Sequence, residues 1–226
     1  MNLQVCMPYE KCPFKCDMCI ANGRSRYANA YETEKEQYLA TLKKAVDSGL
    51  YDDYIITGDS EPTLNSHWVK DVLNVLQGQN TELQTRNYNL KGFNLKHLRT
   101  LNYSITDSKG YLKSWKFRKI DNNNRLVILL TKDFDFLTSK NFDNMGYNQI
   151  TFKVLQETAD LKTNEWIKEN AMTNFDNIYQ IIERYNGSET SIRIDTNCQD
   201  SHGRYEVFRS DGQFYENWET EKPIER

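Results

Sequence analysis

The order of apolar and polar positions along the chain predicts strands and helices that follow one another in turn. Short apolar runs bounded by turn residues are typical of buried strands. By this criterion we expect strands at 3–7, 53–57, 82–87, 101–106, 126–131, 149–155 and 191–195. Residues 108–124 contain no such run, and we expect an irregular loop there.

Apolar residues at helical spacing predict two helices in the first third of the chain. The first follows Thr33 and Glu36, which have the spacing of a capping box, and Gly49 is placed to end it. The second begins near Asn65 or Ser66 and carries the apolar stripe Trp68, Val69, Val72, Leu73 and Leu76. Two further helices are expected at 163–170 and 173–185.

Strands that alternate with helices are typical of an α/β fold with a parallel sheet, in which ligands gather at the carboxyl ends of the strands. A closed eight-unit barrel needs about 250 residues, and this chain has 226. We therefore expect an open, partial (β/α)6-type TIM barrel with outer helices. From residue 204 the pattern RYEVF, a Ser-Asp-Gly turn and QFYENW predicts a short C-terminal β-hairpin. The expected division is a barrel domain at 1–200 and a hairpin extension at 201–226.

Charge and hydropathy narrow the range of functions. The chain carries 29 basic and 32 acidic residues, a net charge of −3, so it lacks the positive field that holds a long nucleic acid. It contains no apolar run of membrane-spanning length and no secretory segment at residues 1–20. These features predict a cytoplasmic protein with no membrane or long nucleic acid as partner.

Three of the five cysteines, Cys12, Cys16 and Cys19, lie within eight residues, on a loop expected directly after the first strand. In a reducing compartment this clustering indicates metal or redox chemistry rather than disulfides. Thiolates at C-x3-C-x2-C spacing can surround one soft metal centre. Three ligands are one fewer than a closed zinc site needs, whereas a four-iron cluster held by three cysteines keeps one iron open.

Two other interpretations of the cluster remain. A zinc site could take Cys6 as its fourth ligand, although Cys6 lies in or beside the strand. The cysteines could also be unliganded packing residues, but Lys11, Lys15 and Asp17 interleave with them and are unusual in a core segment.

The cysteine spacing, with Met18 just before the last cysteine, resembles the signature of the radical S-adenosylmethionine (radical SAM) superfamily. A second element lies after the second strand, where Gly58, Asp59, Ser60, Glu61 and Pro62 resemble the family's Gly-rich loop with a Glu-Pro pair. The family has Gly before that pair and this chain has Ser60, which alters how closely the backbone can be approached.

The resemblance implies that Cys12, Cys16 and Cys19 ligate a [4Fe–4S] cluster whose fourth iron chelates S-adenosylmethionine. It also implies a reductive cleavage that gives a 5′-deoxyadenosyl radical, which abstracts hydrogen from a substrate. Cofactor contacts are expected from Met18 near the adenine and from 58–61 around the ammonium. Thr85 and Ser104 are placed to meet the methionine carboxylate or the ribose, although polar residues are also ordinary in strands.

The substrate is expected at the later strands, and the sequence singles out no catalytic side chain. Polar candidates there are Lys132, Lys153, Gln156, Arg193, Asp195, Asn197, Cys198 and His202. They suit a pocket wall for an anionic or nucleoside-like substrate, and equally a surface loop with ion pairs. His67 and His97 have no partner that indicates catalysis and are expected to be structural. Cys198 alone follows Cys19, too few thiolates for a second cluster.

Three functions therefore remain open. The first is a radical SAM enzyme acting on a small-molecule or nucleotide-like substrate, with an electron donor such as flavodoxin or ferredoxin. The second is a radical SAM peptide maturase or a glycyl-radical-type activase. The third, of another class, is a non-catalytic zinc-stabilised binding protein.

Overall fold

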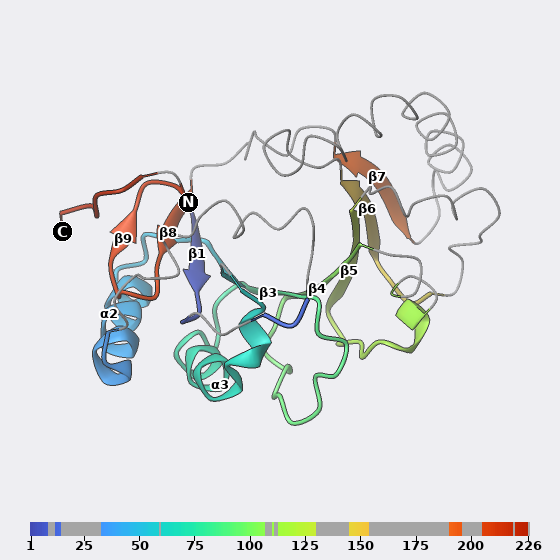
Figure 1. Ribbon diagram of the computed structural model, residues 1–226, viewed down its shortest axis with the longest axis horizontal. Helices are drawn as coiled ribbons and strands as arrows, with labels where there is room; N and C mark the ends of the chain where they lie inside the picture. The colour runs from blue at the N-terminus through green and yellow to red at the C-terminus, as the bar shows by residue number, and fades with distance from the viewer. Residues whose placement is uncertain are drawn as a thin grey trace.

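A single nine-stranded sheet organises the fold in the computed structural model, which describes residues 1–8, 12–14, 33–58, 60–106, 110, 113–129, 145–153, 190–195, 205–218 and 220–225. The strands are β1 (Asn2–Cys6), β2 (Asp53–Thr57), β3 (Thr81–Thr85), β4 (Thr100–Ile105), β5 (Asn123–Leu129), β6 (Gln149–Lys153), β7 (Ser191–Asp195), β8 (Tyr205–Phe208) and β9 (Phe214–Tyr215). Their order in the sheet is β7-β6-β5-β4-β3-β2-β1-β8-β9, and the sheet curves without closing (Figure 1).

All pairs from β7 to β8 in that order are parallel, and the β8–β9 pair is antiparallel. Parallel strands need crossover connections, and those of the first units are helices, as expected for βα repeats. The helices are α2 (Lys35–Asp47) and α3 (Ser66–Val75), preceded by the short 3₁₀ helix η2 (Pro62–Leu64). The predicted open, partial barrel is confirmed. The helices expected at 163–170 and 173–185 lie outside the described residues.

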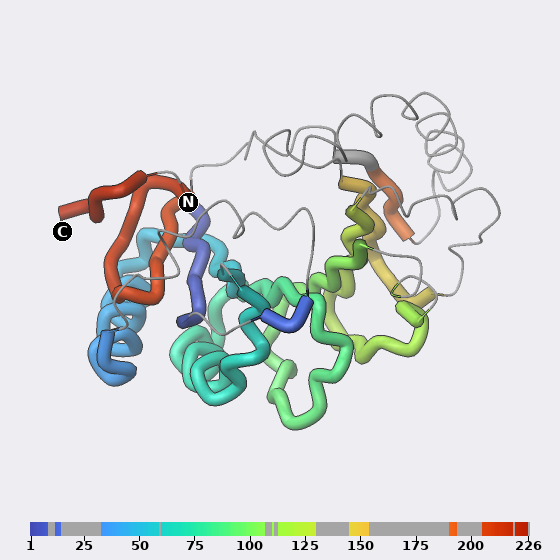
Figure 2. The backbone as a smooth tube through the Cα atoms, in the orientation of Figure 1, coloured from blue at the N-terminus to red at the C-terminus, as the bar shows by residue number. Residues whose placement is uncertain are grey.

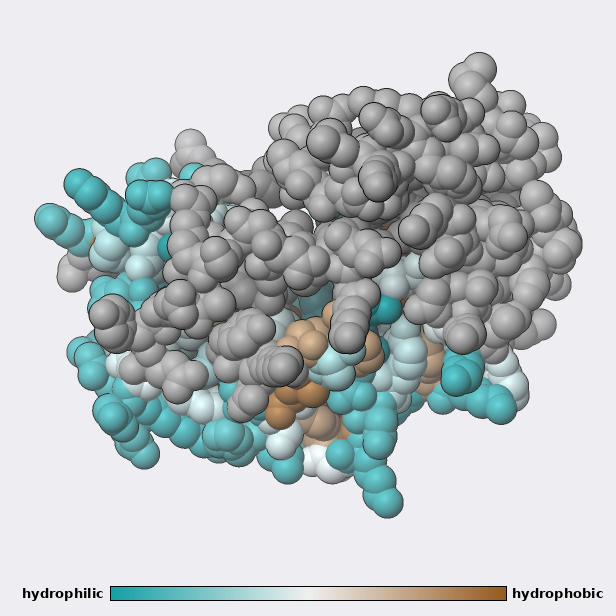
Figure 3. Space-filling view, viewed as in Figure 1, coloured by the Kyte–Doolittle hydropathy of each residue, from teal (hydrophilic) through white to brown (hydrophobic). Residues whose placement is uncertain are grey.

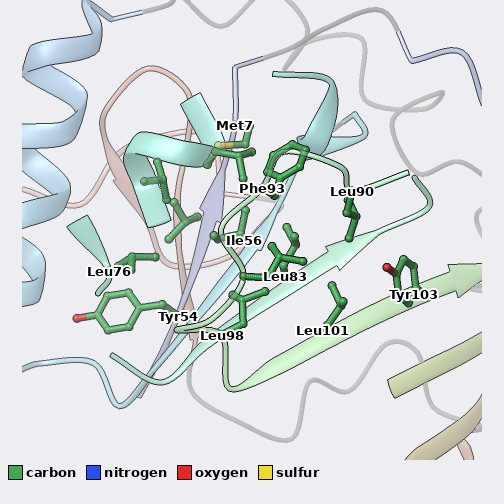
Figure 4. Close-up of a cluster of buried hydrophobic side chains, with 14 of the residues drawn as sticks. Met7, Tyr54, Ile56, Leu76, Leu83, Leu90, Phe93, Leu98, Leu101 and Tyr103 are labelled. Atoms are coloured by element: carbon green, nitrogen blue, oxygen red, sulfur yellow. The ribbon is translucent and has the colours of Figure 1, made fainter. Parts of the chain in front are cut away.

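The convex face of the sheet is apolar and carries the core. Alternate strand residues such as Ile56, Leu83 and Leu101 are completely buried there, and Figure 4 shows how they pack together. Tyr38 of α2 and Val69 of α3 belong to the same cluster, so both helices cover this face (Figure 1). Burial of such side chains contributes about 2 kcal/mol each and is the main force that holds the layers together.

Between β3 and β4 a loop takes the place of a helix on the convex face. Residues 86–99 run without a helix and place Leu90, Phe93, Leu95 and Leu98 in the core. In the next connection the described residues include the 3₁₀ helix η3 (Ser114–Lys116). The sequence predicted little helix between Asn87 and Arg125, which is confirmed for residues 86–99. In the expected loop at 108–124, however, Gly110 and Lys113 are helical and η3 follows them. The sequence also placed residues 123 and 124 in that loop, whereas β5 begins at Asn123.

The start of α2 differs from the predicted capping box. The N-cap is Glu34, and its side chain makes no capping hydrogen bond. Thr33 contacts the C-terminal hairpin turn instead: its backbone N–H donates to the Ser210 carbonyl at 3.5 Å, and its side chain packs beside Gly212. Competition from this tertiary contact explains why the capping box does not form. The predicted end of the helix is confirmed, because Gly49 adopts a φ of 64°.

The predicted C-terminal hairpin is present, with Gly212 in its turn at a φ of 76°. Its strand β8 also pairs in parallel with β1, which the sequence pattern did not predict. Figure 2 shows the first and last parts of the chain side by side. Trp218 Nε1 donates to Gln4 Oε1 at 2.5 Å, so the segment after β9 is fastened to β1 as well. The division at residue 200 stays a prediction.

On the face that Figure 3 shows, the visible described residues are mostly hydrophilic, with apolar residues gathered in a small area near the middle of the view. Among the described residues, no helix combines the length and the apolar composition that crossing a membrane requires.

Candidate cluster and cofactor site

The two motifs converge at one edge of the sheet. Cys12 follows β1, and Glu61 follows β2, the strand paired with it. Thr85 is the last residue of β3, and Ser104 is the penultimate residue of β4. The carboxyl ends of parallel strands share an edge, so these segments gather around the region where open α/β sheets bind ligands.

The carboxylate of Glu61 lies at this edge, and the residue is buried, with 6% of its surface exposed. Its Oε1 accepts hydrogen bonds from Thr63 N at 3.1 Å, Thr63 Oγ1 at 2.6 Å and Thr85 Oγ1 at 2.5 Å. Its Oε2 accepts from the backbone N–H of Arg86 at 2.7 Å. One carboxylate therefore caps η2 and ties it to the end of β3.

These contacts bear on the expected cofactor role of Glu61 and Thr85. Four donors occupy most of the lone pairs of a carboxylate, and the Thr85 hydroxyl also accepts from Asn87 N at 2.9 Å. Both side chains thus have a structural task first. Their contact with a cofactor stays a prediction, and the backbone carbonyls near Gly58 and Ser60 are the groups of this loop that best suit an ammonium.

The cysteine loop is described on both sides of Cys12. Before it, the Pro8 carbonyl accepts a hydrogen bond from Asn65 Nδ2 at 3.1 Å, in the segment that opens α3. Cys12 itself is half-buried, and its Sγ makes only a weak contact with the Phe14 carbonyl at 3.9 Å. This thiol is partly exposed, and its weak hydrogen bond could be given up without much cost, which fits a metal ligand. Lys11, Lys15, Cys16, Asp17, Met18, Cys19 and Asp59 lie outside the described residues.

Cys6 has different surroundings. It is 3% exposed and packs with Val207 and Tyr215 under the C-terminal hairpin. Burial among apolar side chains disfavours a thiolate. This environment favours packing for Cys6 rather than the fourth zinc ligand of the alternative interpretation.

Arg86 is a site residue that sequence reasoning missed. Its guanidinium carbon lies 5.1 Å from the centre of the Phe14 ring, and its Nη2 donates to Thr106 Oγ1 at 2.6 Å. An arginine directly after the third strand, at the edge where ligands gather, is the signal that could have found it.

From β3 to β6, the concave face of the sheet carries several polar side chains, in contrast to the convex face. Glu82 and Arg125 form an ion pair there at 2.9 Å, with the two side chains 15% and 23% exposed. Asn102 Nδ2 donates to Glu82 at 3.0 Å, and Arg125 Nε donates to Gln149 at 2.7 Å. The alternation of polar and apolar residues within β3 to β6 is the sequence signal that could have predicted these polar contacts.

The later strands bring some predicted substrate residues to the same face. Lys153 and Arg193 alternate with the buried Phe152 and Ile192, and Arg193 Nε donates to Thr151 Oγ1 at 3.2 Å. Ser104 is half-buried and opposite Val127 in the register. Lys132, Gln156, Asn197, Cys198 and His202 lie outside the described residues, and Asp195 is described only in its strand.

An open polar groove of about 420 Å³ lies at the other edge, beside the amino ends of β3 to β5. His97, Arg99 and Asn122 are among its lining residues. The motif loops lie at the opposite edge, where the strands end, so His97 is not part of the candidate site. His67 lies in α3, and its backbone carbonyl accepts a hydrogen bond from Lys35 Nζ at 3.4 Å.

The sequence matches no family model and no curated protein. Among solved structures the chain is similar to SuiB of Streptococcus suis bound to the precursor peptide SuiA, with a TM-score of 0.60 and 14% identity over 98% of this chain. It is also similar to native anSMEcpe with bound AdoMet, with a TM-score of 0.65 and 14% identity over 96% of this chain. SuiB bound to S-adenosylmethionine gives a TM-score of 0.57 at 12% identity.

The chain therefore has the fold of proteins that were solved with bound AdoMet or S-adenosylmethionine. This shared fold agrees with the resemblance of the two motifs to radical SAM enzymes. The chain spans 62% of the SuiB chain and 74% of the anSMEcpe chain.

Proposed function

We propose that this protein is a radical SAM enzyme with a single [4Fe–4S] cluster on Cys12, Cys16 and Cys19. The observation that carries the proposal is the meeting of the cysteine loop and the Glu61 loop at the carboxyl ends of the paired strands β1 and β2. The fold shared with proteins solved with bound AdoMet supports it.

The donor set fits these cofactors. Three closely spaced thiols, of which Cys12 is half-buried and weakly bonded, suit soft iron and leave a fourth coordination position open. When bound, the cluster supplies one electron, from a donor such as flavodoxin or ferredoxin, for cleavage of S-adenosylmethionine to the 5′-deoxyadenosyl radical.

The residues of the chain then bind and orient. The backbone around Gly58 and Ser60 offers carbonyls to the ammonium of the cofactor, and the Glu61 hydrogen bonds hold that backbone in place. Ser104 lies on the concave face, where it is placed to meet the carboxylate or ribose. Preorganised polar groups of this kind cost no reorganisation during the reaction.

For the substrate, the polar concave face supports a small-molecule or nucleotide-like compound. Lys153 and Arg193 supply positive charge at β6 and β7, which suits an anionic group. A peptide substrate is the second candidate, favoured by the similarity to a protein solved with its precursor peptide. An activase that acts on a partner enzyme belongs to the same candidate.

Anaerobic purification and reconstitution test the enzyme class. We expect a brown protein with about four irons and four sulfides per chain, which releases 5′-deoxyadenosine from S-adenosylmethionine after reduction. The Cys12/Cys16/Cys19→Ala triple variant is expected to lose both properties, and Cys6→Ala is the matched control that keeps them. A colourless protein with one zinc and no iron would show instead the zinc-stabilised binding protein.

Hydrogen transfer separates the substrate classes. Candidate small molecules and peptides are supplied in deuterated form, and deuterium is followed into 5′-deoxyadenosine by mass spectrometry. Transfer from an anionic small molecule, weakened by Arg193→Gln, supports the first candidate. Transfer from a peptide alone supports the second.

A further inference from the structure

Arg86 contacts three other loops at the carboxyl edge of the sheet. Its backbone N–H donates to Glu61 in the loop after β2, at 2.7 Å. Its guanidinium lies over the ring of Phe14, between Cys12 and Cys16, at 5.1 Å, and donates to Thr106 after β4, at 2.6 Å. Arg86 itself follows β3, so one residue links the ends of β1, β2, β3 and β4.

The chemistry of an arginine suits this task. A planar guanidinium can stack on an aromatic face while its edge donates hydrogen bonds, and lysine cannot do both. The contact is partly shielded from water, since Phe14 is half-buried and Thr106 is 8% exposed. Shielding strengthens cation–π and charge-assisted hydrogen bonds.

The anchoring points lie on both sides of Cys12. Upstream, the side chain of Asn65 holds the Pro8 carbonyl at 3.1 Å. Downstream, Arg86 holds Phe14, two residues after Cys12. Cys12, Pro13 and Phe14 belong to no helix or strand, so side-chain contacts of this kind determine where the loop lies.

We propose that Arg86 is a positioning residue for the iron–sulfur cluster, acting through Phe14. It keeps the cysteine loop against the strand ends, and it places a positive charge beside the loop that carries the thiolates. The inference rests on the proposed function. It assigns to Arg86 a part in retaining the cluster and in setting its reduction potential, which depends on nearby charge.

Loss of iron to a chelator under anaerobic conditions tests the contact. The variants are Arg86→Met, Phe14→Leu and the double variant, with Arg99→Met, an exposed arginine at the other edge of the sheet, as control. Each single change is expected to speed iron loss about tenfold, the usual size of a partly shielded cation–π contact. The double variant is expected to match the single variants rather than multiply them, because both remove one contact.

The reduction potential separates positioning and charge from general stability. Redox titration followed by electron paramagnetic resonance is expected to show a lower potential in Arg86→Met than in Arg86→Lys, which keeps the charge. Thermal unfolding of the apoprotein identifies any variant that fails to fold, and Arg86→Lys then serves for the iron-loss comparison.

The outcomes are distinct. A wild-type protein that takes up no iron would overturn the proposed function itself. A wild-type protein that holds the cluster, with iron loss and potential unchanged in Arg86→Met, would overturn the role of Arg86 alone. Effects of Arg86→Met and Phe14→Leu that multiply in the double variant would overturn the route through Phe14.

Discussion

Glu61 shows how one buried carboxylate can fix the geometry of the loop that follows β2. The resemblance to radical SAM enzymes draws attention to the charge of this residue. In the structure, its two oxygens accept hydrogen bonds from Thr63, from Thr85 and from the backbone N–H of Arg86. At the scale of single residues, Glu61 therefore has a structural role, whether or not it also contacts a cofactor.

Replacement of Glu61 is expected to act mainly on the stability of the folded protein rather than directly on cofactor binding. Glu61→Gln replaces one accepting oxygen with an NH2 group, which would point at hydrogen-bond donors and leave them without an acceptor. The change should reduce the free energy of unfolding by about 2 kcal/mol. Urea unfolding of the apoprotein measures this, with Glu36→Gln on the exposed face of α2 as control. An unchanged urea midpoint, together with lost binding of S-adenosylmethionine, would make Glu61 a ligand residue instead.

Gly58→Ala is expected to separate folding from cofactor binding. An added Cβ would lie 3.6 Å from Met7 N and 3.6 Å from the Ser60 carbonyl, which is ordinary contact. Stability should therefore change by less than about 0.5 kcal/mol. If the cofactor approaches this backbone closely, its affinity should fall about tenfold. Equilibrium dialysis of reconstituted protein with labelled S-adenosylmethionine provides the measurement.

Gly78→Ala is the opposite control for that experiment. Gly78 has open space around it but adopts a φ of 87°, which strains any other residue. It should cost about 1 kcal/mol of stability and leave cofactor affinity unchanged. Equal affinities in the two variants would exclude close approach of the cofactor at Gly58.

At the scale of elements, the segment around η3 contributes side chains to the core, as a longer crossover helix would. Its Phe117 and the Tyr147 that precedes β6 enter the core, and Tyr147 Oη donates to the Ser114 carbonyl at 2.8 Å. Lys119 donates to the carbonyls of Ser114 and Phe117, both at 3.3 Å, and lies 3.6 Å above the Tyr147 ring. The amine thus adds to the hydrogen bond that the Ser114 carbonyl accepts from Phe117 N at 3.1 Å, and it ties this turn to the Tyr147 ring.

This lysine should make stability depend on pH. Burial lowers the pKa of Lys119 to about 8 from its usual 10.5, so the folded protein loses this proton before the unfolded chain does. The cost of burying the charge is present below pH 8 and declines as pH rises toward 10.5.

Lys119→Met removes that cost, so its advantage over the wild type should shrink by about 2 kcal/mol between pH 7 and pH 9.5. Urea unfolding at both values measures the difference. Tyr215 does not interfere in this range, because burial and its hydrogen bond to Asp211 raise its pKa to about 12. A constant difference between the two proteins would mean that Lys119 titrates normally.

The sequence predicted elements well wherever a local pattern determines them. The runs at 53–57 and 191–195 coincide with β2 and β7, because buried strands need apolar residues whatever surrounds them. The start of β5 was missed, since Asn123 and Asn124 are polar; Asn124 fits there by bonding Ile120 N and O at 2.9 and 2.8 Å. The capping box at Thr33 failed for a different reason, because its tertiary partner in the C-terminal hairpin is contained in no local pattern.

The site was predictable only in part. The spacing of Cys12, Cys16 and Cys19 and the Glu-Pro pair identified both motif loops, because their chemistry is written in adjacent residues. The contacts of Arg86 with Phe14 and Thr106 depend on how four strand ends align, which residue types alone do not specify.

At the scale of the whole molecule, the C-terminal hairpin completes the sheet on one side. Arg209 is buried there, and its Nη2 donates to the carbonyls of Trp218 at 2.9 Å and Thr220 at 2.8 Å. The segment packs Val207 and Tyr215 over Cys6 on the concave side of β1. The hairpin therefore protects a strand that also carries the cysteine loop.

Deletion of residues 205–226 should expose the edge of β1 and destabilise the whole sheet. Unpaired backbone groups beside uncovered apolar residues favour association, so size-exclusion chromatography is expected to show large species and urea unfolding a lost or broadened transition. Deletion of 221–226 alone, which spares β8 and the Arg209 hydrogen bonds, is the control. A monomeric, cooperatively unfolding deletion of 205–226 would contradict this role.

The parallel pairing of β1 with β8 also has a consequence for synthesis on the ribosome. Val5 leaves the ribosome well before its register partner Phe208. A nascent chain must therefore keep β1 half-paired for the time needed to translate about 200 residues, at about 5–20 residues per second. If Cys12, Cys16 and Cys19 hold the proposed cluster, iron inserted before that point would enter a loop whose supporting strand is still incomplete. The proposal therefore implies that the cluster is assembled after translation rather than during it.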